Sequence, residues 1–476
     1  MLHYCNQRKC ITKMKRLIIL LILSFSFKTH LSGEINIYFS HSVDTTLANP
    51  TKAQGFVALD EKLIDRIVQT QYSIDFCFYN IKRQNVVDSL ISAYYRGVDI
   101  RVITEHDHID NQAIIDIINA GIPVIDDAFG NNSGNHYMHD KFAIFDFRDS
   151  TSIDDDWSWT GSYNTTNEGT ESNANNAVEI QGKELARAYT LEFQEMWGSD
   201  SGVPNPDSSK FHGNKEDNTQ HSFLIDSIPV ELYFSPSDHS TEKICNVITT
   251  SDSSIYFCIL SYTRQDVCDS MKARWDSGVS VKGVFDRAEW LTQYSKSRDM
   301  TGDTTTTNPW SPPAPVFSDS VQAPWGPKQL HHKYMIIDSD YDSTAIVITG
   351  SQNWSNNGEL YNDENILIIH SADIAHQYLQ EFVERYREAG GEYIGIDREK
   401  KRVIREHKIQ VYPNPFFNSL NIKGCLKTRI YDISGKFVAE VKELWYGRDA
   451  YGHTVPLGIY FLKVDGMYVG KVVKMK

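Results

Sequence analysis

The sequence predicts an α/β protein made of two similar lobes, followed by a small all-β sandwich. Three observations support this: an internal repeat of strand–helix–strand segments, a histidine–lysine motif at the same place in both copies, and a change to short strands punctuated by turns near the C-terminus. Strands that alternate with helices form βαβ units, so each lobe is expected to be an α/β/α layer structure with a mostly parallel sheet. We expect the two lobes to pack about a pseudo-two-fold axis.

The repeat is visible without inserting any gap. Residues 73–105 align on residues 254–286, and 11 of the 33 aligned positions are identical. Each copy is an apolar strand, an amphipathic helix, a Gly-Val pair and a second apolar strand. The predicted divisions of the chain are a signal peptide at 1–33, a first lobe at 34–198, a linker at 199–228, a second lobe at 229–390, a linker at 391–407 and a sandwich at 408–476.

The charge of the chain is unevenly distributed. The sequence holds 47 basic and 62 acidic residues, and residues 34–400 alone hold 27 basic against 56 acidic. Non-specific binding to nucleic acid depends on many Lys and Arg side chains that neutralise phosphates. The acidic central region therefore disfavours broad contact with a nucleic-acid backbone.

The N-terminal segment is typical of a secretory signal peptide. Three basic residues at 13–16 precede an apolar run at 17–27, and small residues follow at 32–33. An N-terminal membrane anchor is the alternative. Five cysteines lie beyond this segment, and their spacing matches no metal-binding motif. In an oxidising compartment Cys245 and Cys268 could form a disulfide, which the sequence does not decide.

The C-terminal segment changes character from about residue 408. Short apolar stretches alternate with Pro and Gly, as in Tyr412-Pro413-Asn414-Pro415-Phe416 and Gly458-Ile459-Tyr460-Phe461. This pattern predicts a small sandwich. It resembles the C-terminal immunoglobulin-like sorting domains of secreted bacterial proteins, which implies a role in export or surface attachment. A carbohydrate- or protein-binding sandwich is the alternative.

A motif of the form His-x-Lys-x4-Asp occurs once in each copy of the repeat, and a Gly-Ser-x-Asn sequence follows each of them. Two such groups at matching places in a duplicated chain are far more specific than a single His-x-Lys. The residues concerned are His139, Lys141, Asp146, Ser162 and Asn164 in the first copy, and His331, Lys333, Asp338, Ser351 and Asn353 in the second.

These residue types suit chemistry on a phosphate. Residues i and i+2 of a strand face the same side, so His139 and Lys141 project together, as do His331 and Lys333. Two ammonium groups and neutral donors can hold a phosphate. One neutral imidazole can attack phosphorus while a protonated one delivers a proton to the leaving oxygen. No metal is required, because the lysines supply the positive charge.

The duplicated motif resembles the signature of the phospholipase D superfamily, and the resemblance covers about residues 34–390. It implies hydrolysis of a phosphodiester through a covalent phosphohistidine, without a cofactor. It makes His139 and His331 the nucleophile and the general acid, and gives phosphate binding to Lys141, Lys333, Asn164 and Asn353, supported by Ser162 and Ser351. Asp146 and Asp338 are expected to be structural, because five residues along a strand lead to its opposite face.

The downstream acidic-Asn pair of this family is present in only one copy. Glu364-Asn365 matches it, whereas the first copy has Asn175-Asn176 and lacks the carboxylate. The acidic residues near that position are Glu171 and Glu179, both out of register. We expect Glu364 to orient a histidine, most simply His331, with Asn176 and Asn365 in supporting places. The family pattern implies that the histidine of the first copy, His139, is the nucleophile. The presence of Glu364 in the second copy argues for His331 instead. Of the two, we favour His139.

Other residues near the motifs are predicted to have ordinary structural roles. His136, His332 and His370 are expected at the surface or in packing, and the acidic stretches 154–156 and 338–342 are expected to be solvated turns. Five tryptophans, at 157, 159, 310, 325 and 354, are either core residues or the lining of a lipid or nucleobase groove. The long segment 301–327 suits a lid over a lipid.

The resulting hypothesis is a secreted phosphodiesterase that hydrolyses phospholipids. We expect a monomer with one site between the lobes, transient contact with a membrane surface, and recognition of the C-terminal domain by a secretion machinery. A secreted, metal-independent endonuclease acting on DNA or RNA is the alternative, because fold alone does not separate the two. A third hypothesis is an inactive surface-binding protein.

Overall fold

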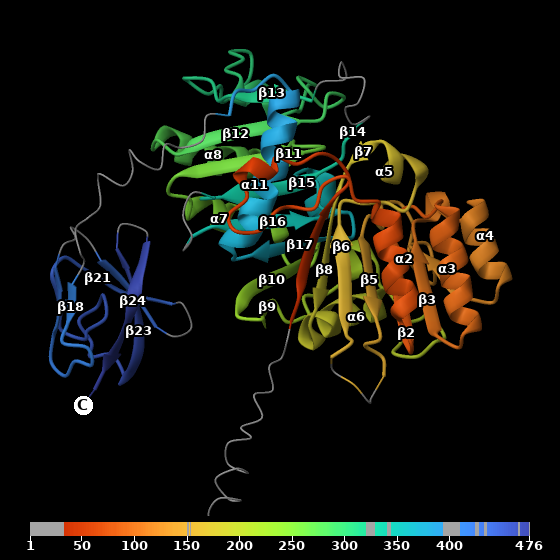
Figure 1. Ribbon diagram of the computed structural model, residues 1–476, viewed down its shortest axis with the longest axis horizontal. Helices are drawn as coiled ribbons and strands as arrows, with labels where there is room; N and C mark the ends of the chain where they lie inside the picture. The colour runs from red at the N-terminus through yellow and green to blue at the C-terminus, as the bar shows by residue number, and fades with distance from the viewer. Residues whose placement is uncertain are drawn as a thin grey trace, which may run out of the picture.

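The structure is a computed structural model that describes residues 33–149, 152, 154–319, 329–339, 344–393, 410–423, 428–432, 436–464 and 467–475. The predicted signal peptide, except Gly33, lies outside the described residues, as do Trp325 and most of the predicted linker 391–407. Two α/β lobes lie side by side (Figure 1). Within the described ranges, no helix combines the length and the apolar character needed to cross a membrane.

The first lobe is a seven-stranded sheet in the order β1-β8-β6-β5-β2-β3-β4. Its strands are β1 (Ile35–Phe39), β2 (Ser73–Phe78), β3 (Asp99–Thr104), β4 (Val124–Asp126), β5 (Lys141–Phe145), β6 (Trp157–Gly161) and β8 (Asn176–Gln181). Its helices are α2 (Leu59–Gln69), α3 (Gln84–Tyr95), α4 (Gln112–Asn119), α5 (Asn167–Glu171) and α6 (Lys183–Trp197), with short 3-10 turns at Thr45–Leu47 and His106–His108.

The second lobe repeats this order and adds one edge strand, giving β13-β12-β11-β15-β16-β17-β10-β9. Its strands are β9 (Ser222–Ile225), β10 (Ile228–Ser235), β11 (Ser254–Ile259), β12 (Ser280–Phe285), β13 (Val316–Ser318), β15 (Lys333–Ile337), β16 (Ile346–Gly350) and β17 (Glu364–Ile369). Its helices are α7 (Ser240–Thr249), α8 (Gln265–Asp276), α9 (Ser297–Met300), α10 (Asn356–Leu360) and α11 (Ala372–Glu388). The pseudo-two-fold axis itself stays a prediction.

The expectation of mostly parallel sheets is wrong. In the first lobe only β2–β3 and β3–β4 are parallel, and the other pairs of that sheet are antiparallel. The parallel part comes from the strand–helix–strand repeat. The strands that follow the histidines are connected by loops, which between β6 and β8 include the five-residue helix α5. None of these connections is a crossover, so the neighbouring strands pair antiparallel. The second lobe follows the same rule.

The hydrophobic core is continuous between the lobes. One cluster of buried side chains includes Phe142 and Tyr189 from the first lobe and Phe234, Leu367 and Tyr378 from the second. Separate clusters fill the outer side of each sheet, under α2 and α3 in the first lobe and under α7 and α8 in the second. Burial of this apolar surface holds the two half-sites in one body.

The predicted linker 199–228 is partly built into the second lobe. It contains the 3-10 turn His212–Asn214 and the strand β9, which pairs with β10. Phe211 is fully buried, and the Lys215 side chain is too. The segment is therefore a packed connection whose residues contact the core.

The described residues from 410 onward form strands in two sheets. The first has the order β18-β19-β22 and the second β21-β20-β23-β24. A small apolar cluster that includes Phe416, Trp445 and Leu462 fills this part. The strands are β18 (Gln410–Tyr412), β19 (Leu420–Lys423), β20 (Thr428–Tyr431), β21 (Phe437–Val441), β22 (Leu444–Trp445), β23 (Gly458–Val464) and β24 (Met467–Lys474).

Candidate active site between the lobes

Each motif histidine lies just before a buried strand and is held by the backbone of the other lobe. The His139 N–H donates to the Asp363 carbonyl at 2.9 Å, one residue before Glu364. The His331 N–H donates to the Ala174 carbonyl at 3.0 Å, one residue before Asn175. The second contact extends a two-stranded parallel ladder of β7 (Asn173–Ala174) and β14 (Gln329–Leu330). These cross-lobe bonds fix each histidine beside the partner residue of the opposite lobe.

The two imidazoles have different partners. His139 Nδ1 lies 2.8 Å from Glu364 Oε2, and His331 Nδ1 lies 2.8 Å from Asn175 Oδ1. The expectation that Glu364 orients His331 is therefore wrong. The carboxylate is contributed by the second lobe to the histidine of the first, because β17 begins beside the His139 segment rather than beside its own motif.

The lysines are buried beside the histidines. Lys141 Nζ donates to the His139 carbonyl at 2.5 Å, and Lys333 Nζ donates to the His331 carbonyl at 2.7 Å. Burial lowers the pKa of Lys141 to about 8 and also lowers the pKa of Lys333. An anion bound beside these two lysines would stabilise their charged forms.

Both histidines are expected to be neutral in the free protein. Burial lowers the pKa of His139 well below its usual range, and Lys141 and Lys333 lower it further. Burial and the same two lysines have the same effect on the pKa of His331. The lysines of both lobes thus act on the charge of each histidine. A neutral imidazole is a competent nucleophile.

Glu364 is fully buried at the start of β17. Burial raises its pKa to about 8, although Lys141 acts in the opposite direction. A hydrogen bond from His139 Nδ1–H to this carboxylate leaves Nε2 with its lone pair directed away from the glutamate. Nε2 is thus the ring nitrogen of His139 that takes no part in the contact with Glu364.

The Gly-Ser-x-Asn sequences shape the site in the same way in both lobes. Gly161 and Gly350 have φ values of 144° and 146°, and a Cβ there would lie 2.4 Å and 2.2 Å from the backbone oxygens of Asn176 and Asn365. Only glycine fits so close an approach at that φ. The chain then turns into α5 and α10, which are capped by Thr166 and Ser355.

The side chains of Ser162 and Ser351 form hydrogen bonds within the protein. Ser162 Oγ donates to Asn175 Oδ1 at 2.9 Å and accepts from the Asn176 N–H at 3.1 Å. Ser351 Oγ accepts from the Asn365 N–H at 3.0 Å. Their role is therefore to hold the residues that orient the histidines.

Asn164 and Asn353 carry unused polar groups. Within the part of the chain that the structure describes, their buried Oδ1 atoms have no hydrogen-bond partner. Unsatisfied buried amide oxygens are uncommon in proteins. A phosphate oxygen accepts hydrogen bonds, so it would be bound by the Nδ2 groups of these side chains and not by the unpartnered Oδ1 atoms. The phosphate-binding role of Asn164 and Asn353 stays a prediction.

Asn176 and Asn365 join the lobes behind the histidines. Asn365 Nδ2 donates to Asp140 Oδ1 at 2.6 Å, and Asn176 Oδ1 lies 3.2 Å from His332 Nδ1. Asp140 and His332 are the middle residues of the two His-x-Lys motifs. Each asparagine thus pins the motif of the opposite lobe.

Asp146 and Asp338 lie just past the ends of β5 and β15, as structural residues would. Asp146 accepts from the backbone N–H groups of residues 71–73 at 2.6 to 3.2 Å. Asp338 accepts from residues 252–254 at 2.7 to 3.1 Å. Both side chains tie their loop to the start of the adjacent strand.

Two acidic residues that support the histidine segments were missed in the sequence. Glu105 Oε2 accepts from the Met138 N–H at 2.7 Å, and Asp286 Oδ2 accepts from the Leu330 N–H at 3.0 Å. Met138 and Leu330 directly precede the catalytic-site histidines. The available signal was the repeat itself, which aligns Glu105 with Asp286.

A buried ion network behind Glu364 was also missed. Lys215 Nζ lies 3.0 Å from Asp363 Oδ1 and contacts Glu192. His212 lies between Asp127 and Asp363, at 3.1 and 2.9 Å. No motif marked these residues, because Lys215 and His212 belong to a polar segment that resembles a linker.

The remaining candidates lie in structural roles. Trp157, Trp159, Trp310 and Trp354 are buried in the core. His332 is buried against Glu381, and His370 pairs with Glu231. Cys245 and Cys268 are free thiols, so the disulfide left open by the sequence is not formed.

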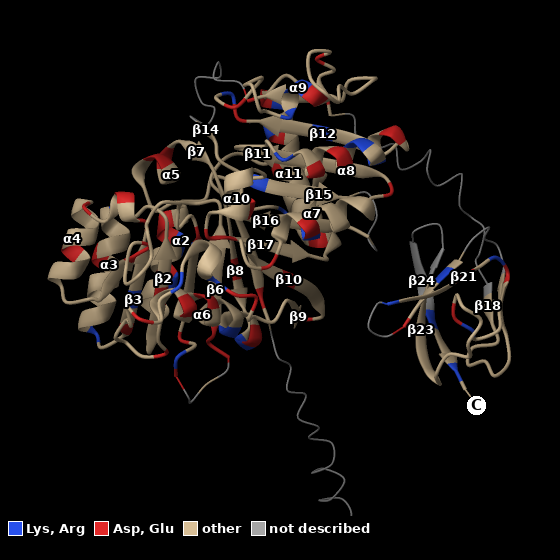
Figure 2. Ribbon diagram, turned by 180° about the vertical axis from the view of Figure 1, so that it is seen from behind, with Lys and Arg blue, Asp and Glu red and all other residues tan. Residues whose placement is uncertain are grey.

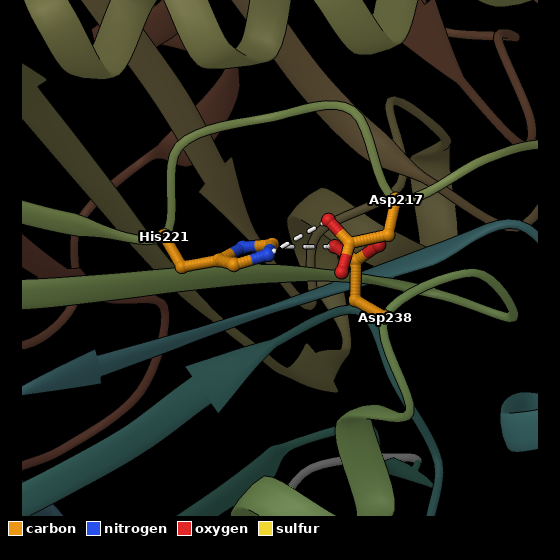
Figure 3. A group of neighbouring side chains, drawn as sticks. All are labelled: Asp217, His221 and Asp238. Carbon is orange, nitrogen blue, oxygen red and sulfur yellow. Dashed lines mark hydrogen bonds and ion pairs between the residues drawn. The ribbon is translucent and has the colours of Figure 1, made fainter.

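A second group of titratable side chains lies away from the motif histidines. Asp217 and His221 come from the connection between the lobes, and Asp238 comes from the loop before α7 (Figure 3). His221 Nε2 lies 2.9 Å from Asp217 Oδ1, and its Nδ1 lies 2.9 Å from the Leu232 carbonyl. Asp238 accepts from the Phe234 N–H at 2.7 Å. These contacts fasten the connection to β10.

Comparison with known proteins agrees with this geometry. A region of 138 residues is 28% identical to mitochondrial cardiolipin hydrolase of Xenopus tropicalis, covering 29% of this chain and 60% of that protein. A region of 156 residues is 28% identical to a phospholipase D of Rickettsia bellii, covering 33% of this chain and 68% of that protein. The chain thus spans about 60% of the length of the first of these curated relatives.

Solved structures support the two-lobe fold. The structure of phosphatidylserine synthase from Haemophilus influenzae superposes with a TM-score of 0.54 at 12% identity, covering 74% of this chain and 86% of that one. Residues 63–197 and 244–386, more than half of the chain, match the family described as "Cardiolipin synthase, PLD-like domain". With one such segment in each lobe and a motif histidine in each segment, this chain belongs to the phospholipase D-like family.

Proposed function

We propose that the protein is a phosphodiesterase in which His139 is the nucleophile and His331 the general acid. The observation that carries this assignment is the difference between their partners, the Glu364 carboxylate for His139 and the Asn175 amide for His331. In its ionised form the Glu364 side chain makes the His139 imidazole more basic and more nucleophilic, whereas the neutral Asn175 amide leaves the His331 imidazolium a stronger acid. One histidine is thus suited to attack and the other to proton donation.

The proposed reaction has two steps, formation of a phosphohistidine and its hydrolysis. The bound phosphate offsets the charge of Lys141 and Lys333, so His331 takes up a proton in the complex. His139 Nε2 then forms a bond to phosphorus, the bond from phosphorus to the leaving oxygen breaks, and the imidazolium of His331 gives that oxygen its proton. Neutral His331 then takes a proton from water, whose oxygen attacks phosphorus and releases His139. Lys141 and Lys333 stabilise the charge on the non-bridging oxygens in both steps.

Phospholipids are the substrate class we propose. The relatives named above are a cardiolipin hydrolase and a phospholipase D. Asp and Glu residues, coloured red in Figure 2, are spread over helices and loops of both lobes, which disfavours binding of a long polyanion. The alternative is an endonuclease that uses the same histidines on DNA or RNA.

One experiment separates these substrates. Wild type, His139→Asn and His331→Asn are incubated in EDTA with mixed phospholipid vesicles and with plasmid DNA. Release of phosphatidic acid by wild type and its loss in both variants would support the proposal. DNA nicking without lipid hydrolysis would overturn the lipid assignment, and loss of activity in EDTA would contradict metal-free catalysis.

Export is a second part of the proposal. The basic and apolar N-terminal segment supports secretion, and the all-β residues from 410 onward suit a sorting or attachment domain. Fractionation of the producing cells tests this. Full-length protein confined to the cytosol would contradict it.

Phosphohistidine trapping tests the assignment of the nucleophile. A substrate labelled in its retained phosphoryl group is quenched in mid-turnover, and the peptide that carries the label is identified. We expect the label on His139. A label on His331 would reverse the two roles.

A further inference from the structure

Aromatic side chains cover one side of the candidate active site. His136 of the first lobe stacks on Tyr361 of the second, with ring centroids 4.8 Å apart and planes at 18°. Tyr137 contacts Tyr79 at 5.7 Å, and Tyr79 contacts the ring of His139 at 4.8 Å. We call His136, Tyr137, Tyr361 and Tyr79 the aromatic face. It reaches from the surface to the proposed nucleophile.

The outer part of the aromatic face is accessible. Tyr137 is 43% exposed, Tyr361 is 42% exposed, and the adjacent Leu360 is 48% exposed. Tyr137 lies two residues before His139, and Tyr361 lies three residues before Glu364. These apolar groups therefore lie next to the residues proposed to carry the chemistry, where a substrate must arrive.

The fold does not demand aromatic residues at these places. The repeat gives the equivalent positions on the His331 side, and they hold Gln329 for Tyr137, Ser172 for Tyr361 and Leu260 for Tyr79. The same backbone is thus built without any of these rings in the other half of the site. The aromatic face is present only on the His139 side of the site, which favours a role in ligand binding over a role in folding.

Charge near the aromatic face distinguishes between ligands. Lys141 and Lys333 are the two lysines of the motifs, and both are buried beside the motif histidines. The carboxylates of Glu105 and Asp107 act on Tyr79, while Lys82 acts on the ring of His108, which contacts Tyr79 at 4.8 Å. A nucleic-acid strand needs a row of cationic groups for its successive phosphates. Mixed charge beside exposed rings instead suits a ligand with one phosphate and an uncharged remainder.

We propose that the aromatic face binds the glycerol and the upper acyl chains of a phospholipid at the bilayer surface while its phosphate lies between the two lysines. Tyrosine suits this boundary because its ring is apolar and its hydroxyl stays in contact with water. The proposal rests on the lipid phosphodiesterase activity proposed above. In it, Tyr137 and Tyr361 make the enzyme prefer phospholipids in a membrane over soluble diesters.

The first test compares two substrates in the full-length protein. The value of kcat/KM is measured for phosphatidylcholine vesicles and for the soluble diester bis(p-nitrophenyl) phosphate, in wild type, in Tyr137→Ala/Tyr361→Ala and in Tyr137→Trp/Tyr361→Trp. We expect the vesicle-to-soluble ratio to fall about tenfold or more in the alanine variant and to be restored by tryptophan, since one buried aromatic contact accounts for a change of this size. Tyr95→Ala, at a tyrosine that is 72% exposed at the far end of α3, should leave the ratio unchanged.

The second test measures binding without turnover. In a His139→Asn background, co-sedimentation with phosphatidylcholine vesicles should weaken about tenfold when both tyrosines are replaced by alanine. An equal loss for both substrates in the first test would show a structural role and overturn the inference. So would undiminished vesicle binding, or a selective loss of single-stranded DNA cleavage. If wild type binds vesicles through these tyrosines but hydrolyses no lipid, the proposed function fails while the aromatic face stands.

Discussion

Asn175 provides the sharpest test of the division of labour between the histidines. Its side chain is fully buried, and its Oδ1 lies 2.8 Å from His331 Nδ1. Asn175→Asp places a carboxylate there and makes the surroundings of His331 resemble those of His139. An ionised carboxylate this close raises the pKa of an imidazole by about 1 to 3 units.

The sign of the effect on catalysis follows from the role of His331. A general acid works only when it is protonated, so kcat/KM falls as the pH rises through the pKa of His331 in the free protein. Burial and the lysines hold that pKa well below its usual range. We therefore expect Asn175→Asp to move the falling limb of the profile to higher pH by at least about one unit, which corresponds to about 1.4 kcal/mol.

The substitution has a cost that can be measured separately. Asn175 Nδ2 donates to the Gly169 carbonyl at 2.9 Å, and a carboxylate cannot replace that bond. A buried unsatisfied carbonyl lowers the free energy of unfolding by about 1–3 kcal/mol. Urea unfolding checks this value and shows that the variant is folded.

The assay is kcat/KM on a soluble diester between pH 4 and 9, with Asn175→Ser as the neutral control. Serine carries no charge and should not move the limb upward. A folded Asn175→Asp protein whose limb coincides with that of wild type would refute the assignment of His331 as the acid. A shift of the rising limb instead would indicate that His331 is the base or nucleophile.

Three further predictions concern the supports of the site. Glu364→Gln removes the carboxylate from His139 and should lower kcat about 10- to 100-fold, measured with saturating soluble diester; unchanged kcat would contradict its role. Lys215→Met removes the buried cation shared by Glu192 and Asp363 and should destabilise the fold by about 3–5 kcal/mol in urea unfolding, against about 0–1 kcal/mol for the exposed Lys62→Met. Gly350→Ala brings a Cβ to 2.2 Å from the Asn365 oxygen and should lower the melting temperature more than Gly278→Ala, which has a positive φ but open space around it; equal losses would show that φ alone matters.

Much of the site can be predicted from residue types and spacing. The repeat marks out two lobes, and His139, Lys141, His331 and Lys333 are identified by the motif that each lobe contains. The glycine before Ser351 is required by the close approach of β17, and its presence in both copies reflects that contact. These features depend on contacts within one strand or between neighbouring strands, so they can be predicted from the sequence.

Sheet direction and partner choice could not be predicted in this way. The antiparallel pairing of β5, β6 and β8 depends on loops that carry no periodic signal. The bond between His139 and Glu364 joins residues 225 positions apart. Lys215 is a basic residue in a polar segment, and nothing in its sequence context shows that Asp363 and Glu192 surround it.

The sequence by itself determined which chemical groups are available: two imidazoles, two ammonium groups, one glutamate where the repeat could have held two carboxylates, and an acidic surface around them. Only the tertiary structure decided which histidine receives that glutamate. The residue at the start of β17, Glu364, contacts the histidine of the first lobe, and the residue just before β8, Asn175, contacts the histidine of the second. The histidine that lacks a carboxylate partner is therefore His331 and not His139. The physical reason is that hydrogen bonds act over about 3 Å in space, whereas the motif reports only order along the chain.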